Sequence, residues 1–198
     1  MIGMVGRVDK VTEVPFNILP KNYFINAEQI YLVHVLCQNA LENSSYEASQ
    51  IAWILGATNS QCPKLDLQNE KHLWHSVQNL IHTFKPTLCF PVGHGGVLGA
   101  VVTCALNSNA QLSLAPETWN TSAKNLFAEG NMGFVLGIST QDDIKKIEQL
   151  LSQDKNSIGQ ILCNVIGTLK QSQTKVTKPL FDLEKMREAY YHSLKRFY

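Results

Sequence analysis

The sequence predicts an α/β (α+β) domain in which a mixed β-sheet is layered with α-helices. Apolar stretches of strand length alternate along the chain with amphipathic stretches of helical spacing. The 198 residues suit one ordinary domain, and they contain neither an internal repeat nor a low-complexity linker. A hydrophobic content of 44% with 17% charged residues excludes a disordered tail or a polybasic arm. We therefore expect one folded domain.

The first third of the chain contains two expected strands and one expected helix. Residues 2–8 predict a short strand. Gln29–Cys37 (QIYLVHVLC) is apolar on both faces of the pleat, which predicts a central strand covered on both sides. Residues 44–55 predict a helix that closes at Gly56, because glycine is favoured at a left-handed helix end.

Residues 65–84 then predict a long amphipathic helix. The next expected elements are a strand (87–92), an apolar helix (97–106), a strand (111–115), a short helix (122–128) and a strand (133–139). Thr140 and Asp143 form a capping-box pattern at the start of a further helix, with Asp in place of the usual Glu. A strand over 162–169 and a helix over 182–197 complete the chain, giving a sheet of about four main strands.

Charge and cysteine usage limit the partners and the compartment. A net charge of +1 offers no electrostatic reason to expect nucleic acid or a membrane surface as partner. The longest apolar run, residues 97–106, is too short to cross a bilayer, and no secretory signal is readable at the start. The five cysteines are odd in number and never form a CxxC pair, so neither a disulfide framework nor a zinc knuckle is predicted. We expect a reduced, cytoplasmic setting.

Three histidines, His72, His75 and His82, share one face of the helix expected over residues 65–84. His75 and His82 would lie about 10.5 Å apart along the helix axis, which is too far for one ion. Because this face lies opposite the apolar stripe, we predict a solvated surface and no metal site.

The most informative segment is residues 87–100 (TLCFPVGHGGVLGA), where a strand runs through glycines into a helix. Such a turn presents backbone N–H groups and the positive end of a helix at one point, which suits a phosphate. Gly95 and Gly96 would let a ligand approach the backbone closely. The same glycines also suit a tight turn with close helix packing, and their spacing misses the dinucleotide fingerprint.

Acid–base chemistry is poorly represented around this turn. His94 is its one titratable residue, and no nucleophile-elbow motif occurs. Glu129 follows Leu126-Phe-Ala and by itself would be interpreted as a solvated acid at a helix end. The sequence therefore assigns no catalytic residue.

Several short segments follow the order of one family's motifs over nearly the whole chain. They are Ile2-Gly-Met-Val-Gly6, Ile30-Tyr-Leu-Val33, Leu41-Glu-Asn-Ser-Ser-Tyr46, Leu126-Phe-Ala-Glu129 and Gly133-Phe-Val-Leu136. Together they resemble the C-terminal domain of phosphoribosylformylglycinamidine synthase, of the aminoimidazole ribonucleotide synthetase superfamily. The resemblance implies that superfamily's fold for residues 1–198 as a single C-terminal-type domain, without the family's N-terminal ATP-binding domain.

The family's glycine turn carries a His, an Asp, a Ser and a second acid, which fall here on Phe90, Pro91, Gly93 and His94. None of these four is retained, and proline also lacks a backbone donor. The family positions that are retained are Gly95, Gly96 and Glu129. With Gly93 and His94 they form the substrate- or phosphate-binding set that the resemblance implies, and no metal ligand is among them.

The resemblance implies an ATP-dependent C–N ligase of purine biosynthesis, which converts formylglycinamide ribonucleotide to its amidine with ammonia from glutamine. ATP and Mg²⁺ are implied for the complete enzyme, and no cofactor is expected for this chain alone. The implied partners are an ATP-binding half or second synthetase chain, a glutaminase subunit, or a second copy. We expect one half of such a ligase, inactive alone. The alternatives are a non-catalytic relative acting as an interaction or ligand-binding module, and an unrelated nucleotide-binding α/β domain.

Overall fold

The computed structural model describes residues 28–42, 49–56, 66–108, 110–115, 123–129, 133–153 and 160–171, together with the helical residues Lys185 and Glu188. The strand expected over residues 2–8 lies outside the described residues. So does the helix expected over 182–197, apart from Lys185 and Glu188, and so does the first part of the helix expected over 44–55.

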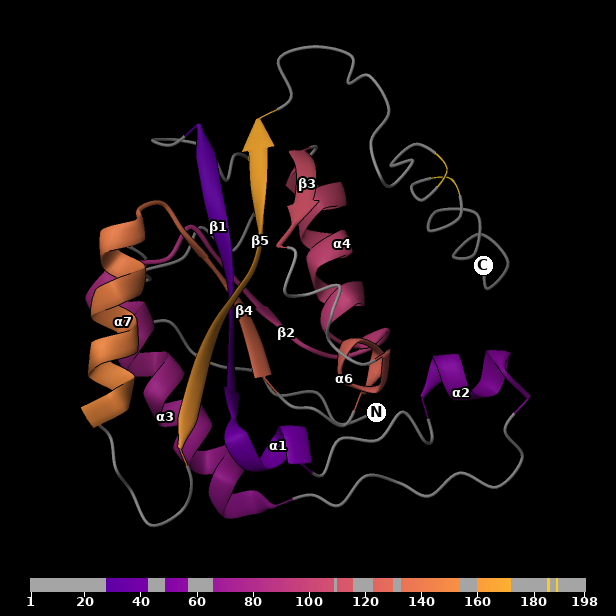
Figure 1. The fold of residues 1–198 in the computed structure, drawn as a ribbon, viewed down its shortest axis with the longest axis horizontal. Coiled ribbons are helices and arrows are strands. Elements are labelled where there is room, and N and C mark those ends of the chain that lie inside the picture. Colours follow the sequence, from indigo (N-terminus) through magenta and orange to yellow (C-terminus); the bar gives the residue numbers. More distant parts are fainter. Residues whose placement is uncertain are drawn as a thin grey trace, which may run out of the picture.

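Five strands form one sheet in the order β2-β4-β1-β5-β3 (Figure 1). Their bounds are Gln29–Cys37 (β1), Leu88–Pro91 (β2), Ala110–Leu114 (β3), Gly133–Ile138 (β4) and Ile161–Gln171 (β5). The predicted class, a sheet layered with helices, is confirmed. The four pairings described are all antiparallel, whereas the sequence predicted a mixed sheet. β1 occupies the predicted central position.

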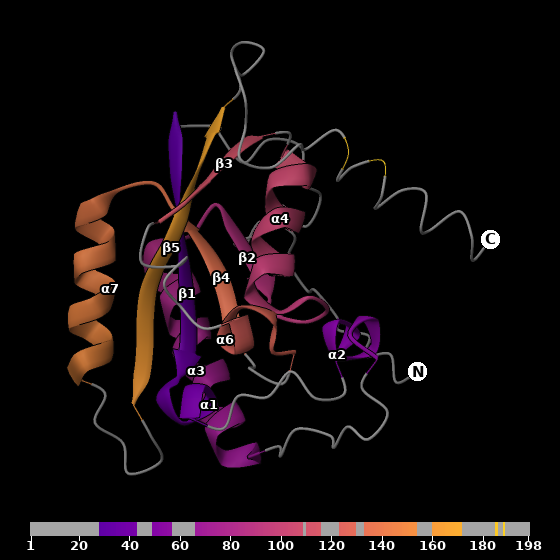
Figure 2. The same cartoon turned by 45° about the vertical axis from the view of Figure 1, so that its right-hand side comes forward.

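Helices cover both faces of the sheet (Figures 1 and 2). On one face lie α3 (Leu67–Phe84) and α7 (Gln141–Gln153), and on the other lie α4 (Gly96–Ser108) and the short α6 (Ala123–Phe127). These four helices correspond to predicted ones. The chain after β1 also forms α1 (Gln38–Glu42), which was not predicted, and α2 (Gln50–Ile54), which ends at Gly56 with a φ of +78° as expected.

The two faces of β1 belong to two separate apolar clusters. Ile30 and Leu32 pack into the cluster under α4, and Val33 and Val35 pack into the cluster under α3 and α7. All four side chains are fully buried. At the step between Leu32 and Val33, β5 contains an extra residue, Ile166, which the pairing skips. Such a bulge bends the long strand while both its ends stay paired with β1.

Both ends of α3 follow local chemistry. Asp66 accepts hydrogen bonds from the backbone N–H groups of Gln68 and Asn69, at 3.0 and 3.2 Å, as an N-cap residue does. At the other end, Lys85 adopts a left-handed conformation with a φ of +47°, and its N–H donates to the Ile81 carbonyl. This position suits glycine, because a side chain there clashes with the backbone.

Replacing Lys85 by glycine should therefore raise the free energy of unfolding by about 1 kcal/mol. Lys85→Ala is the matched control, because it removes the charged side chain and keeps the Cβ atom. Urea denaturation of the three proteins measures the difference. An equal gain in both variants would contradict the conformational explanation.

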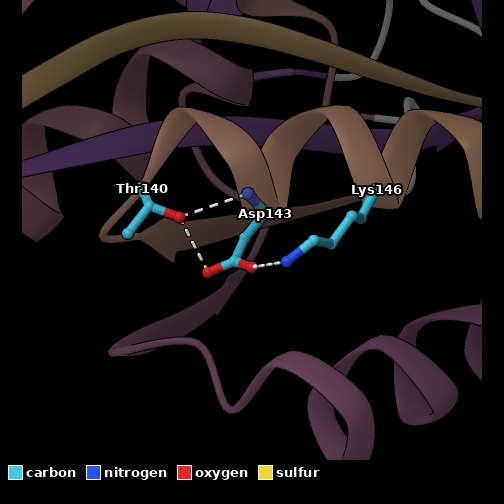
Figure 3. A network of polar contacts seen from close by, with 3 residues as sticks. All are labelled: Thr140, Asp143 and Lys146. Carbon is cyan, nitrogen blue, oxygen red and sulfur yellow. Dashed lines mark hydrogen bonds and ion pairs between the residues drawn. The ribbon is translucent and has the colours of Figure 1, made fainter.

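The start of α7 is held by the network in Figure 3. The Thr140 hydroxyl accepts from the Asp143 N–H at 3.1 Å and donates to Asp143 Oδ2 at 2.8 Å, while Lys146 Nζ lies 3.3 Å from Asp143 Oδ1. The predicted capping residues thus meet, but the Asp143 carboxylate binds the hydroxyl of Thr140 and not its N–H. The hydrogen bond from Thr140, aided by Lys146, lowers the pKa of Asp143 below 3.8.

Asp143→Asn should destabilise the protein at neutral pH. Because the pKa of Asp143 is lowered in the folded state, its contribution is complete above the unfolded pKa and is lost as the pH falls through the folded pKa. The stability difference between wild type and variant should therefore narrow below about pH 4. Urea denaturation at stepped pH measures it, with the exposed Asp142→Asn as control. A difference that is constant with pH would refute this account.

Candidate functional site

The predicted strand–turn–helix unit is present at one edge of the sheet. β2 is an edge strand, and its last residue, Pro91, pairs with Phe134 of β4. The N–H of Val92 still donates to the Gly133 carbonyl at 2.8 Å. Residues 93–96, which we call the glycine turn, then lead directly into α4.

The conformation of the glycine turn explains two of its glycines. Gly95 and Gly96 have φ angles of +75° and +63°, a region that other residues rarely adopt. The Gly96 N–H donates to the Gly93 carbonyl at 2.9 Å, and the Gly99 N–H donates to the Gly95 carbonyl at 2.9 Å, which starts the helix. These two amides are thus used within the chain.

The close approach that Gly96 permits is made by the chain itself. A Cβ atom on Gly96 would lie 2.5 Å from the carbonyl oxygen of Leu126 and 2.7 Å from the carbonyl carbon of Phe127, both in α6. A Cβ atom on Gly93 would meet nothing within 4 Å. The space that the sequence analysis associated with a ligand at Gly96 is therefore filled by α6. This geometry is the tight turn with close helix packing that was the other interpretation.

Glu129, just beyond α6, binds the glycine turn. Its Oε1 accepts the Gly95 N–H at 3.0 Å, and its Oε2 lies 3.4 Å from His94 Nδ1. The Glu129 side chain is only 17% exposed, so its interpretation as a solvated helix-end acid is wrong. The structure thus brings the five predicted residues, Gly93, His94, Gly95, Gly96 and Glu129, to one place. The negative member of that set makes the turn, as it stands, a poor fit for a phosphate.

The histidine face is partly different from the prediction. His75 and His82 are exposed, as expected, but the side chain of His72 is one of the buried side chains of α3. The helix is rotated so that position 72 faces inward beside Leu73, which the apolar spacing did not reveal. Across the described ranges, no group of three or more His, Cys, Asp or Glu residues is placed to hold a metal ion.

The cysteines that the structure describes do not form a nucleophilic centre. Burial raises the pKa of Cys37 and of Cys89 to about 11, and that of Cys104 and of Cys163 to about 12. A thiol becomes a good nucleophile when its pKa is lowered, so these side chains act as small apolar groups.

Sequence analysis missed one buried ionisable residue near the turn. His34, on β1, is fully buried, and burial lowers its pKa to about 4, so the imidazole is neutral at physiological pH. Among the described residues its Nε2 has no hydrogen-bond partner, and it lies 2.7 Å from where a Cβ atom on Gly133 would be. The available signal was a histidine inside the apolar run of residues 30–37. The same Cβ atom on Gly133 would also lie 2.8 Å from the backbone carbonyl oxygen of Val35, so His34 and the backbone of β1 together explain why position 133 is glycine.

Comparisons with known proteins identify the kind of domain. No protein-family model matches the chain. In sequence, it is 24% identical over 159 residues to the PurL subunit of phosphoribosylformylglycinamidine synthase from Prochlorococcus marinus (strain NATL1A), covering 77% of this chain and 19% of that relative. The PurL subunit of strain MIT 9312 is 25% identical over 205 residues, covering all of this chain and 25% of the relative.

Solved structures give the same answer for the fold. T. maritima PurL complexed with FGAR has a TM-score of 0.53 at 12% identity, covering 73% of this chain and 24% of that one. PurLQS from Thermotoga maritima has a TM-score of 0.51, covering 79% and 26%. The fold of this chain is thus similar to that of part of these PurL structures. Its resemblance to the C-terminal domain of phosphoribosylformylglycinamidine synthase is confirmed, and it is related to PurL, of which it spans about a quarter.

The alternative of an unrelated nucleotide-binding α/β domain does not fit these findings. A dinucleotide-binding fold needs parallel strands with the glycine turn inside the sheet. Here the described strands pair antiparallel, and β2, which leads into the turn, is at the edge.

No described helix is both long and apolar enough to cross a membrane.

The packing of α6 on the turn leads to a prediction about stability. Gly96→Ala places a Cβ against backbone atoms of Leu126 and Phe127 and keeps an unfavourable φ, so it should lower the free energy of unfolding by about 3 kcal/mol. Gly93→Ala is the matched control in the same turn and should have little effect. Chemical denaturation compares them. Equal effects at both positions would show that α6 does not rest on Gly96.

Proposed function

We propose that this chain is a C-terminal-type domain of a phosphoribosylformylglycinamidine synthase that acts in purine biosynthesis together with other chains. In this proposal residues 1–198 form one synthetase domain, which is inactive alone. Its role is to form one side of the substrate-binding cleft of the assembled, ATP-dependent ligase. The proposed setting is the cytoplasm, in keeping with the free, buried or half-buried cysteines among the described residues.

The observation that carries the proposal is the extent of the likeness to PurL. The alignment with the MIT 9312 relative runs along the whole of this chain, and the fold likeness covers 73% of it. The chain nevertheless corresponds to only about a quarter of these proteins. In this proposal the rest of the synthase is supplied by other chains, as in an assembly of the PurLQS kind.

The residues of this chain support a structural role for it in the active site of the assembled ligase. ATP and Mg²⁺ are implied for the complete enzyme, but the described residues offer no metal ligand set, and the Gly95 amide is bonded to Glu129. We therefore assign the binding of ATP and Mg²⁺ to the partner chain that carries the ATP-binding half. A glutaminase subunit that delivers ammonia is a further proposed partner.

One observation favours a second candidate, a non-catalytic relative that works as an interaction module. The glycine turn is already closed by Glu129, and Pro91 lacks a donor at the end of β2. A domain whose turn has no open amide at Gly95 can still bind another synthetase chain, or a second copy, through its surface.

Reconstitution tests the proposal. The purified chain is titrated into a Prochlorococcus marinus PurL that lacks the region aligned with this chain, with formylglycinamide ribonucleotide, ATP, Mg²⁺ and ammonium chloride present. Amidine formation should appear and saturate as the chain is added, because the missing domain is restored. Each component alone and the intact PurL are the controls.

The same titration separates the two candidates when light scattering is added. A stable complex with no amidine formation would favour the interaction module. Neither activity nor a complex, with this shortened PurL or with a second copy, would refute both.

A further inference from the structure

Three consecutive large apolar side chains are exposed at α2, and we call them the α2 patch. They are Trp53, Ile54 and Leu55, which are 80%, 69% and 70% exposed. Single apolar residues are ordinary on a protein surface, but neighbouring ones of this size mark a place of contact. The helix lies beyond α4 and α6, away from α3 and α7 (Figures 1 and 2).

The backbone of α2 fixes the outward direction of the patch. The hydroxyl of Ser49 accepts the Ala52 N–H at 3.2 Å, and the Gly56 N–H donates to the Trp53 carbonyl at 3.0 Å. Ser49 and Ala52 are both buried, so they form the inner side of this helical turn. The patch is therefore on the outer side, and rotation of its side chains alone cannot bury it.

The C-terminal segment, residues 182–197, has an apolar face that suits this patch. Its apolar residues recur at helical spacing, at Leu183, Met186, Tyr190, Leu194 and Phe197. The structure describes two residues of the segment, Lys185 and Glu188, and both are helical and exposed. On a helix these two positions lie opposite the apolar face. Since residues 49–56 include no charged side chain, the apolar face would meet an uncharged surface there.

The size of the patch favours a segment of the same chain over a separate protein. A stable complex between two proteins buries about 800 Å² on each partner, and three side chains supply only part of such an area. A tethered segment is held close by the backbone, so a smaller contact is sufficient. Residues 172–181, which follow β5, can span up to about 35 Å when extended.

We propose that the apolar face of residues 182–197 packs on the α2 patch of the same chain. The contact covers Trp53 and its two neighbours and leaves Lys185 and Glu188 in solvent. It also keeps the patch from associating with other copies of the chain. This inference does not depend on the proposed function.

The test is acrylamide quenching of Trp53 fluorescence in the full chain, with Trp74→Phe and Trp119→Phe so that one tryptophan remains. Trp74→Phe keeps an aromatic ring against Phe134. Trp53 should be protected in this protein. Leu194→Ser removes an apolar contact, so quenching should increase and the emission should shift to longer wavelength. Glu188→Ser, an exposed position in the same segment, is the matched control and should change neither.

Three results would overturn the proposal. The first is quenching of Trp53 in the background protein that is as efficient as in urea, a result that needs no C-terminal variant. The second is a Trp53 that stays protected in Leu194→Ser while circular dichroism shows the native fold. The third is protection that disappears on dilution while light scattering shows a dimer dissociating, because the patch would then be covered by a second copy.

Discussion

Burial of β1 on both faces is the constraint on which the rest of the structure depends. Ile30 and Leu32 enter the cluster under α4, while Val33 and Val35 enter the cluster under α3 and α7. A strand with two apolar faces can be stable only in the middle of a sheet with helices on both sides. The short strands β2 and β3 are consequently placed at the edges.

The edge position of β2 decides the environment of the glycine turn. Because β2 lies at the edge of the sheet, the chain leaves the sheet at the end of β2 and enters α4 on the side where α6 packs. Two backbones then meet at Gly96, at a distance that allows no side chain. This contact carries Glu129 to the Gly95 amide, so the candidate site follows from packing between helices and sheet.

The likeness to PurL and the geometry of the turn describe a fold shared with PurL whose glycine turn is bonded within the chain. The fold is that of a portion of PurL, and the chain spans about a quarter of those proteins. Its turn, however, is satisfied by an internal carboxylate. The chain therefore shares a fold with part of PurL, while the segment that leads from β2 into α4 contains Phe90, Pro91, Gly93 and His94.

The sequence by itself determined the described strands and main helices, because apolar periodicity, caps and glycines act within a few residues of one another. Together with the family resemblance, it also indicated the five residues that lie together at the glycine turn. Only the tertiary structure decided that the described strands pair antiparallel, that His72 and His34 are buried, and that Glu129 binds Gly95, 34 positions away. These facts depend on contacts between segments that are distant in the sequence. A local sequence pattern does not specify such contacts, so only the packing of the sheet and its helices reveals them.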